Sequence, residues 1–196
     1  MLDVLKEERV RATFFVVGEA AQAYPDTIRR IAREGHALGN HSWDHAHLLG
    51  KPAAFVRREL ALTDDALARI ANVRPRLMRP PFGQRDFSLM AEARREGYTV
   101  VMWSDRLPND WEQPGDRTIS ARVVSRVRDG SIVVLHDGNR GLLCSRAKLP
   151  ARTCERAQEI AATREIIDAL HAKGYRFVTI PELLAENARL GSSGAK

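Results

Sequence analysis

Cysteine is scarce in this sequence, and its arrangement argues against the metal sites that cysteine pairs usually build. The two cysteines, Cys144 and Cys154, lie ten positions apart in one predicted loop. They form no CxxC pair and have no set of histidines around them, so a zinc knuckle is not expected. A disulfide between them would suit an oxidising compartment, and two thiols a reducing one. The sequence leaves both alternatives open.

Long apolar runs and targeting signals are also missing. Apolar runs such as Ile132 to Leu135 fall far short of the roughly 20 residues that cross a bilayer. The start, residues 1–8, is amphipathic and acidic, and it lacks the basic and apolar regions of a signal peptide. We therefore expect no membrane span and no signal peptide in this chain, and the compartment stays open.

The charge pattern does not suggest a nucleic-acid partner. The net charge is +6, from 31 basic and 25 acidic residues, but no block of five like charges occurs and no basic stripe is interleaved with aromatics. We interpret the basic excess as a solvated face, which can also attract anionic polymers such as cell walls at long range. With 44% hydrophobic and 29% charged residues, the composition is that of an ordinary globular protein. The length predicts one domain, residues 1–189, and a disordered tail, residues 190–196.

What the sequence does contain is an alternation of helical segments and short apolar strands. Glycine and proline mark most of the boundaries, as in the segment that ends at Gly35 and is interrupted near Pro25. The expected helices are residues 1–9, 19–34, 52–70, 86–96, 118–129 and 155–173, with a short one opened by Pro181. The expected strands are residues 12–17, 36–39, 76–79, 98–102, 131–135 and 175–180. Repeated strand–helix units predict an α/β fold with parallel strands in a barrel-like arrangement.

The sharpest motif is HSWDH, which carries His41 and His45 directly after a predicted strand. Two histidines at positions i and i+4 share one face of a helical turn, so both rings can reach one metal ion. Zinc accepts two histidines and a carboxylate and leaves a position for water. His36, before the strand, is interpreted as a packed structural histidine. His47 is interpreted as a bystander, with a substitute metal ligand as the alternative.

Three further polar segments follow predicted strands, where barrels of parallel strands place their active sites. RPPFG holds Arg79 on a turn that two prolines make rigid, so its guanidinium can orient a carboxylate. WSDRLPNDW, residues 103–111, combines acids with tryptophans that suit sugar rings or that merely cap the barrel. LHD places His136 at the end of an apolar strand, where it can act as a general acid.

Taken together and in this order, HSWDH, RPPFG and LHD resemble the polysaccharide deacetylases of carbohydrate esterase family four, also called the NodB-homology family. ATFFVVG and GYRFVTIPELL are similar to that family as well, and the resemblance covers about residues 1–185. It implies a distorted, TIM-like, seven-stranded (β/α) barrel. It also implies a metal-dependent hydrolase that removes acetyl groups from N-acetylated glycans of the chitin, chito-oligosaccharide or peptidoglycan type. Such enzymes usually act outside the cell or in its envelope.

The resemblance also implies a role for each motif residue. His41 and His45 would bind a divalent metal, expected to be zinc, with cobalt or nickel as alternatives. Ser42 would position a ligand ring, and Arg79 would tether the catalytic base. The remaining implied roles are an oxyanion donor at the Phe82 backbone, a general acid at His136 oriented by Asp110, and pocket walls at Trp111 and Leu135.

The sequence departs from the family pattern in three places. The family's opening TFDDG motif, on its first strand, would supply the catalytic base and a third metal ligand. It does not occur here, so we expect the first barrel strand to be missing. The family's RxPY is RPPF in this chain. The DxxDW spacing is wider, since four residues separate Asp105 from Asp110, and either aspartate can support His136.

A missing first strand would affect both activity and association. Without the base and the third ligand we expect weak metal binding and, at most, slow turnover. The strands at 12–17 and 175–180 would have unpaired edges, which favour self-association. Three explanations stay open: an upstream segment that carries TFDDG, a pseudoenzyme that keeps a glycan groove, or a second chain that completes the barrel. A hydrolase of small cyclic amides or formamides is a further alternative, against which the paired tryptophans argue weakly.

Overall fold

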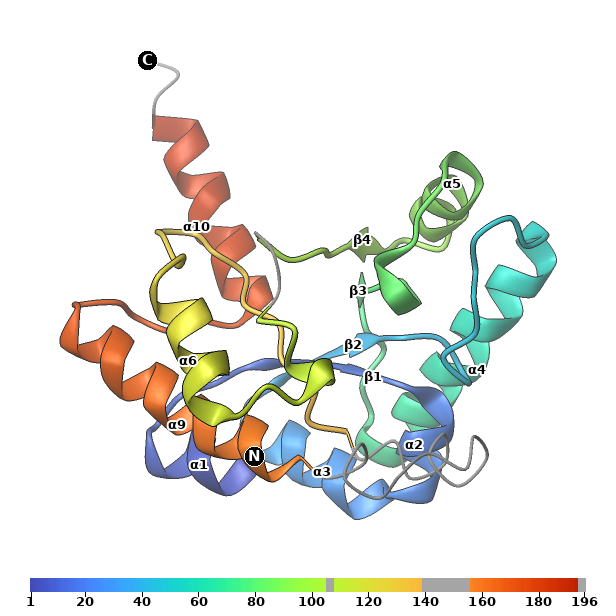
Figure 1. Ribbon diagram of the computed structural model, residues 1–196. Coiled ribbons are helices and arrows are strands. Elements are labelled where there is room, and N and C mark those ends of the chain that lie inside the picture. Colours follow the sequence, from blue (N-terminus) through green and yellow to red (C-terminus); the bar gives the residue numbers. More distant parts are fainter. Residues whose placement is uncertain (105–107, 139–155, 194–196) are drawn as a thin grey trace. The chain divides into compact units, whose positions relative to one another are not determined.

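The computed structural model describes residues 1–104, 108–138 and 156–193. Two predictions fall outside these ranges: the pairing of Cys144 with Cys154, and Asp105 as the support of a histidine. The described residues form two compact units, and their helices and strands are labelled in Figure 1.

The first unit, called the sheet unit, comprises Arg11–Met102 and the segment from Thr179 onward. Its centre is a parallel four-stranded sheet in the order β1-β2-β3-β4. The strands are β1 (Thr13–Val16), β2 (Ala37–Asn40), β3 (Leu77–Met78) and β4 (Thr99–Val100). The helices are α2 (Gly18–Ala23), α3 (Pro25–Arg33), α4 (Ala53–Ala71), α5 (Phe87–Arg95) and α10 (Ile180–Ser193). Each strand pairs in parallel with the next one along the chain, as the strand–helix pattern predicts.

Two helices and the third strand contribute to a hydrophobic core of the sheet unit. Helix α4 begins after Pro52 and ends at Asn72, which adopts a left-handed conformation with φ of 54°. Its apolar face packs with α5 and with Met78 of β3. The buried members of this cluster are Leu48, Val56, Leu60, Met78, Leu89, Ala93 and Tyr98. Because the cluster includes Met78, the last residue of β3, it anchors the position from which the following turn starts.

The second unit, called the helical unit, comprises Met1–Val10 and Trp103–Val178. Its helices are α1 (Leu2–Glu7), α6 (Asp116–Val124) and α9 (Ala157–Ala172), with a short 3-10 turn η2 (Asp110–Glu112). Helices α6 and α9 share a core of Ile119, Val123, Ala162, Ile166 and Leu170. None of the described helices of either unit combines the length and the apolar character that a membrane span requires.

Two of the predicted strands are corrected by the structure. Residues 131–135 and 175–179 form no β-strand, and Ile180 opens helix α10. An apolar extended segment becomes a strand only where a neighbouring backbone pairs with it. The amide of Ile132 instead donates to the hydroxyl of Ser104 at 3.0 Å, and the Ser104 amide donates to the Ile132 carbonyl at 3.1 Å. These isolated contacts do not continue as a ladder within the described residues.

The predicted disordered tail is corrected at its beginning. Helix α10 continues to Ser193, three residues beyond Leu190, and residues 194–196 lie outside the described ranges. The preceding residues, Leu183 to Leu190, are mostly good helix formers, so the helix has no early stop signal. The described residues therefore show an α/β fold with one parallel four-stranded sheet.

Candidate active site

The loop after β2 carries both histidines of the HSWDH motif, but it is not the helical turn that their spacing predicts. Residues 41–47 are irregular, and Ser42 and His45 have positive φ angles of 63° and 60°. The loop amides bond to side chains instead of helical carbonyls: Ser42 N–H donates to Asn40 Oδ1 at 2.9 Å, and Trp43 N–H donates to Glu59 Oε2 at 3.0 Å. The rings of His41 and His45 nevertheless lie edge to face, with centroids 4.9 Å apart.

The same loop is hydrogen-bonded to the N-terminus of helix α2. The amides of Gly18 and Glu19 donate to the carbonyls of Ser42 and Trp43 at 3.0 and 2.8 Å. These two N–H groups have no acceptor inside their own helix, so the loop supplies the acceptors that a helix start needs. Residue 18 must be small, because a Cβ there would lie 2.4 Å from the Trp43 ring. The position of the histidine loop is therefore tied to the strand–helix junction after β1.

The His41 ring is oriented by a backbone carbonyl. Its Nδ1 lies 2.6 Å from the carbonyl oxygen of Arg79, and only a protonated Nδ1 can donate to that acceptor. In the neutral ring the lone pair then belongs to Nε2, which is the arrangement that metal-binding histidines adopt. We predicted that Ser42 would position a ligand ring, and this is wrong. The Ser42 hydroxyl is buried and has no hydrogen-bond partner within the described part of the chain.

The two histidines fit a zinc ion as part of its ligand set. Imidazole nitrogens are suitable donors, and two of them leave positions for a further ligand and for water. Among the described residues no group of three or more His, Cys, Asp or Glu side chains forms a metal cluster. His36 is not part of the set. As we predicted, it is a packed residue: it is buried, accepts the Ala12 N–H at 3.1 Å, and its pKa is lowered by burial.

Arg79 lies at the end of β3 and bonds to backbone carbonyls. Its Nε and Nη2 donate to the carbonyls of Val101 and Met102, both at 3.2 Å. The guanidinium carbon lies 4.1 Å from the centroid of the Phe15 ring, a cation–π contact. Burial lowers the pKa of Arg79 to about 10, so the side chain stays charged at neutral pH. Thus Arg79 joins β1, the His41 ring and the end of β4.

Phe82 lies in a 3-10 turn, η1 (Pro81–Gly83), with a left-handed backbone at φ of 59°. Its ring is 52% exposed and makes an edge contact with His45 at 4.6 Å between centroids. Its second ring partner is His47, whose ring stacks on Phe82 with centroids 3.9 Å apart. The HSWDH pattern predicts His47 as a bystander, with a substitute metal ligand as the alternative. Only its position two residues after His45 could have drawn attention to it.

A buried polar network behind the histidine loop was missed from the sequence. Asn40 is fully buried, and its Nδ2 lies within 3.0 Å of the Leu60 carbonyl, Asp64 Oδ1 and the Tyr98 hydroxyl. Burial raises the pKa values of Asp64 and Tyr98, and it also raises the pKa of the loop-holding Glu59. Such a network specifies one conformation because every member needs its partner. The only sequence signal was a polar residue, Asn40, at the end of an otherwise apolar strand.

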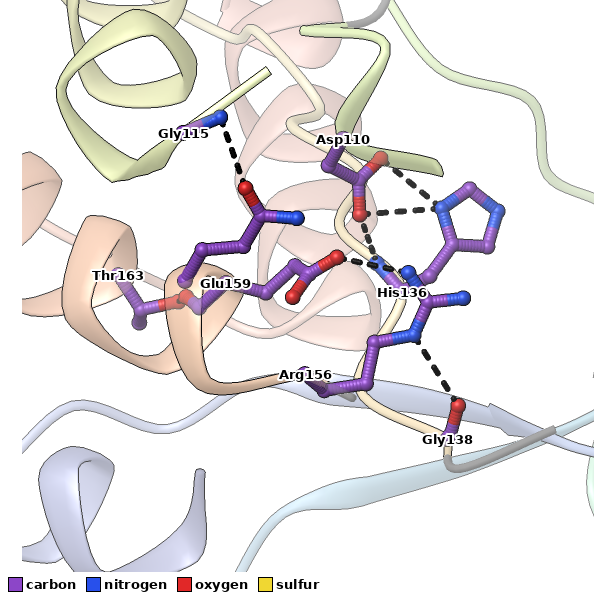
Figure 2. Close-up of polar contacts among 8 residues, drawn as sticks. Asp110, Gly115, His136, Gly138, Arg156, Glu159 and Thr163 are labelled. Carbon is purple, nitrogen blue, oxygen red and sulfur yellow. Dashed lines mark hydrogen bonds and ion pairs between the residues drawn. The ribbon is translucent and has the colours of Figure 1, made fainter. Parts of the chain in front are cut away.

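In the helical unit, Asp110 and His136 lie together (Figure 2). Asp110 is fully buried, and its carboxylate accepts the backbone N–H of His136 at 2.6 Å. The same carboxylate faces the His136 Nδ1 at 2.9 and 3.2 Å. The His136 side chain is 43% exposed, with Nε2 on the side of the ring away from Asp110. One buried carboxylate therefore fixes both the backbone and the ring of this histidine.

A second ion pair lies close to this contact in the helical unit. Arg156 donates to Glu159 Oε1 at 2.7 Å, with both side chains buried, and its Nε lies 3.4 Å from the Gly138 carbonyl (Figure 2). The pair connects the start of α9 to the segment that follows His136. No sequence pattern marks it, because Arg156 and Glu159 resemble the other charged residues of this helix.

The two pocket residues predicted in the helical unit have different environments. Trp111 is 48% exposed and belongs to the η2 turn beside Asp110. Leu135 is partly buried and packs against the core of α6 and α9. His41, His45, Arg79 and Phe82 belong to the sheet unit, whereas Asp110, Trp111, Leu135 and His136 belong to the helical unit.

Comparison with known proteins identifies the relatives of this chain. Residues 1–101 match the family model described as Polysaccharide deacetylase. A peptidoglycan-N-acetylglucosamine deacetylase from Bacillus cereus is 32% identical over 185 residues, which are 94% of this chain and 80% of that protein. A chitooligosaccharide deacetylase from Rhizobium leguminosarum bv. trifolii is 35% identical over 183 residues, which are 93% of this chain and 83% of that protein.

A solved structure supports the same relationship. The peptidoglycan deacetylase PdaC from Bacillus subtilis matches with a TM-score of 0.82 at 32% sequence identity, and the match covers 98% of this chain and 85% of the solved one. The full-length PdaC sequence is longer, and this chain spans 35% of it.

Proposed function

This chain belongs to the polysaccharide deacetylase family, and from this premise we propose that it hydrolyses the acetamide bonds of N-acetylated glycans of the peptidoglycan or chitooligosaccharide type. In this reaction water adds to the acetyl carbonyl carbon and the C–N bond breaks. The products are acetate and a free amine on the glycan.

The observation that carries the proposal is the contact between Asp110 and His136. A leaving amine needs a proton, and a histidine is the usual group to supply it. The buried carboxylate holds Nδ1 at 2.9 Å, so the ring presents Nε2 outward from a fixed position. We assign His136 as the general acid and Asp110 as the residue that orients it. The Arg156–Glu159 pair supports the segment that follows His136.

His41 and His45 are the proposed metal ligands. A bound divalent ion, expected to be zinc with cobalt or nickel as alternatives, would polarise the acetyl carbonyl. Arg79 acts through its main chain, because its carbonyl keeps the Nε2 lone pair of His41 available for the ion. A carboxylate partner for the Arg79 guanidinium, which would be the catalytic base, stays a prediction.

The remaining roles concern the acetyl group. We propose that the backbone N–H of Phe82 donates to the developing oxyanion, since the left-handed turn at this residue redirects its amide. Trp111, half-exposed beside Asp110, is proposed to cover the sugar or the acetyl methyl. Leu135, which packs against the α6–α9 core, is proposed as an apolar wall.

The proposed complete fold is the distorted seven-stranded (β/α) barrel that the resemblance implies. Its support is the parallel order of β1 to β4. Within the part of the chain that the structure describes, β1 has a ladder partner only on its β2 side. An apolar edge of this kind favours pairing with another strand, so we expect concentration-dependent self-association.

A deacetylation assay with and without zinc tests the proposed function. N-acetylated chito-oligosaccharides and peptidoglycan fragments would be incubated with the full chain, and the released acetate would be measured. We expect slow, zinc-dependent release that His136→Ala abolishes and that His171→Ala, a matched exposed histidine of the same unit, leaves unchanged. Glycan binding by calorimetry without any release would instead favour a non-catalytic glycan-binding protein. If the chain neither bound the glycans nor released acetate, both proposed functions would be contradicted.

A further inference from the structure

The loop after β2 and the turn after β3 meet in a row of three rings. Phe82 stacks face to face on His47, with centroids 3.9 Å apart and 7° between the ring planes. The same ring meets His45 edge to face, at 4.6 Å and 70°. The row therefore joins three residues. His45 is a proposed metal ligand, Phe82 carries the proposed oxyanion donor, and His47 has no assigned role.

His47 is anchored to the turn by a hydrogen bond as well as by the stack. Its Nδ1 lies 2.9 Å from Gln84 Oε1, the side chain that follows the turn directly. A second link joins the same two loops, because Asp86 Oδ2 accepts the Gly50 N–H at 3.0 Å. These contacts join the histidine loop to the RPPFG turn and the residues that follow it.

Phe82 needs such support for two reasons. Its backbone has φ of 59° and ψ of 6°, a left-handed conformation that residues other than glycine adopt rarely and keep only where their surroundings hold them. Its side chain is 52% exposed, so burial in a core does not fix the ring. The His47 face covers one side of the ring and restricts how far the turn can rotate.

We propose that His47 is a positioning residue whose ring, stacked on Phe82, fixes both the Phe82 backbone N–H and the His45 ring. The stack itself is a feature of the structure, whereas the tasks of Phe82 and His45 rest on the proposed function. Because His47 acts through its ring face, a phenyl ring should replace it. If it were a metal ligand, a phenyl ring would not.

The test uses the full chain with His47→Phe, His47→Ala and a control, Phe87→Ala. Phe87 is a matched exposed aromatic, 96% accessible, on the segment next to the turn. The first measurement is the ¹⁵N order parameter of the Phe82 amide without metal. We expect an order parameter of about 0.85 in the parent, His47→Phe and Phe87→Ala, and one below about 0.6 in His47→Ala. The second is zinc affinity by competition with a chromophoric chelator. We expect a loss of about 10-fold in His47→Ala only.

Two results would overturn the proposal. An unchanged Phe82 order parameter in His47→Ala would show that the stack does not fix the Phe82 backbone. A loss of zinc affinity in His47→Phe as large as that in His47→Ala would make His47 a ligand. If the parent chain binds no zinc and releases no acetate, the proposed function fails, while the order parameter still decides the role of the stack. Where turnover is measurable, His47→Ala should lower kcat about 10-fold and leave KM within about twofold.

Discussion

The sheet unit and the helical unit hold their candidate active-site histidines by different means. In the sheet unit the His41 ring is held by a neutral backbone carbonyl, and the His45 ring makes a T-shaped contact with Phe82. In the helical unit the His136 ring is held by the carboxylate of Asp110. A neutral acceptor fixes the tautomer that a metal ligand needs, whereas a carboxylate suits a ring that gains and loses a proton. The partner of each histidine thus matches its proposed task.

The two arrangements also differ in how many residues maintain them. The HSWDH loop is held by Asn40, Glu59 and the start of α2, with further support from the Arg79 carbonyl. The position of His136 depends mainly on Asp110, which bonds to both its backbone and its ring. Single substitutions should therefore have larger effects in the helical unit than in the sheet unit.

The largest effect is expected from Asp110→Asn. The amide keeps the shape of the side chain but removes the charge, and one of its two polar atoms can no longer accept a hydrogen bond from His136. We expect kcat for acetate release to fall about 10²-fold or more, since this is the size of a general-acid contribution. Asp129→Asn, at an exposed position of the same unit, is the control. A kcat within twofold of the parent value would contradict the assignment of Asp110.

Gly18→Ala should have the next largest effect, in the sheet unit. The new methyl would lie 2.4 Å from the Trp43 ring and 2.7 Å from the Thr63 hydroxyl, so the histidine loop must shift. We expect a loss of about 1–3 kcal/mol in the free energy of unfolding, measured with urea, together with weaker zinc binding. Gly138→Ala is the control, because a Cβ there meets nothing within 4 Å. Equal stability of the two variants would mean that the loop is not tied to α2.

A smaller, pH-dependent effect is expected from Glu59→Gln. Burial raises the pKa of Glu59 in the folded chain above its unfolded value, so protonation favours the folded state. This contribution is fully present at low pH and is lost as pH rises through the raised pKa. The parent should therefore lose stability relative to Glu59→Gln as the pH rises above 4.5, the ordinary pKa of a glutamate. Urea unfolding across this range measures the difference, with Glu96→Gln as the exposed control. A difference that does not vary with pH would exclude Glu59 as its source.

The smallest effect is expected from Ser42→Ala. The hydroxyl is buried without a hydrogen-bond partner in the described residues, so its removal should change stability by about 1 kcal/mol or less. Zinc affinity should also stay within about twofold, whereas loss of a ligand-orienting group typically costs about 10–100-fold. Chelator competition on the parent and the variant distinguishes the two. A loss in the larger range would restore the predicted role of Ser42.

The sequence alone determined the α/β class, the residues of the three motifs and most of the helices. Apolar periodicity and the glycine and proline boundaries are local properties, so they located α2 and α3 on either side of Pro25 as well as the long helix α4. The family resemblance could also be recognised, because the order of short motifs along the chain is a property of the sequence itself.

Only the tertiary structure decided how these residues are held. The HSWDH loop is irregular because its amides bond to Asn40 and Glu59. Residues 131–135 are not a strand because no neighbouring backbone forms a ladder with them within the described residues. The partners of the His41 ring and of His47 come from the turn after β3, 37 or 38 positions further along the chain. Hydrogen bonds and ring contacts between distant residues follow from packing, and no local pattern encodes them.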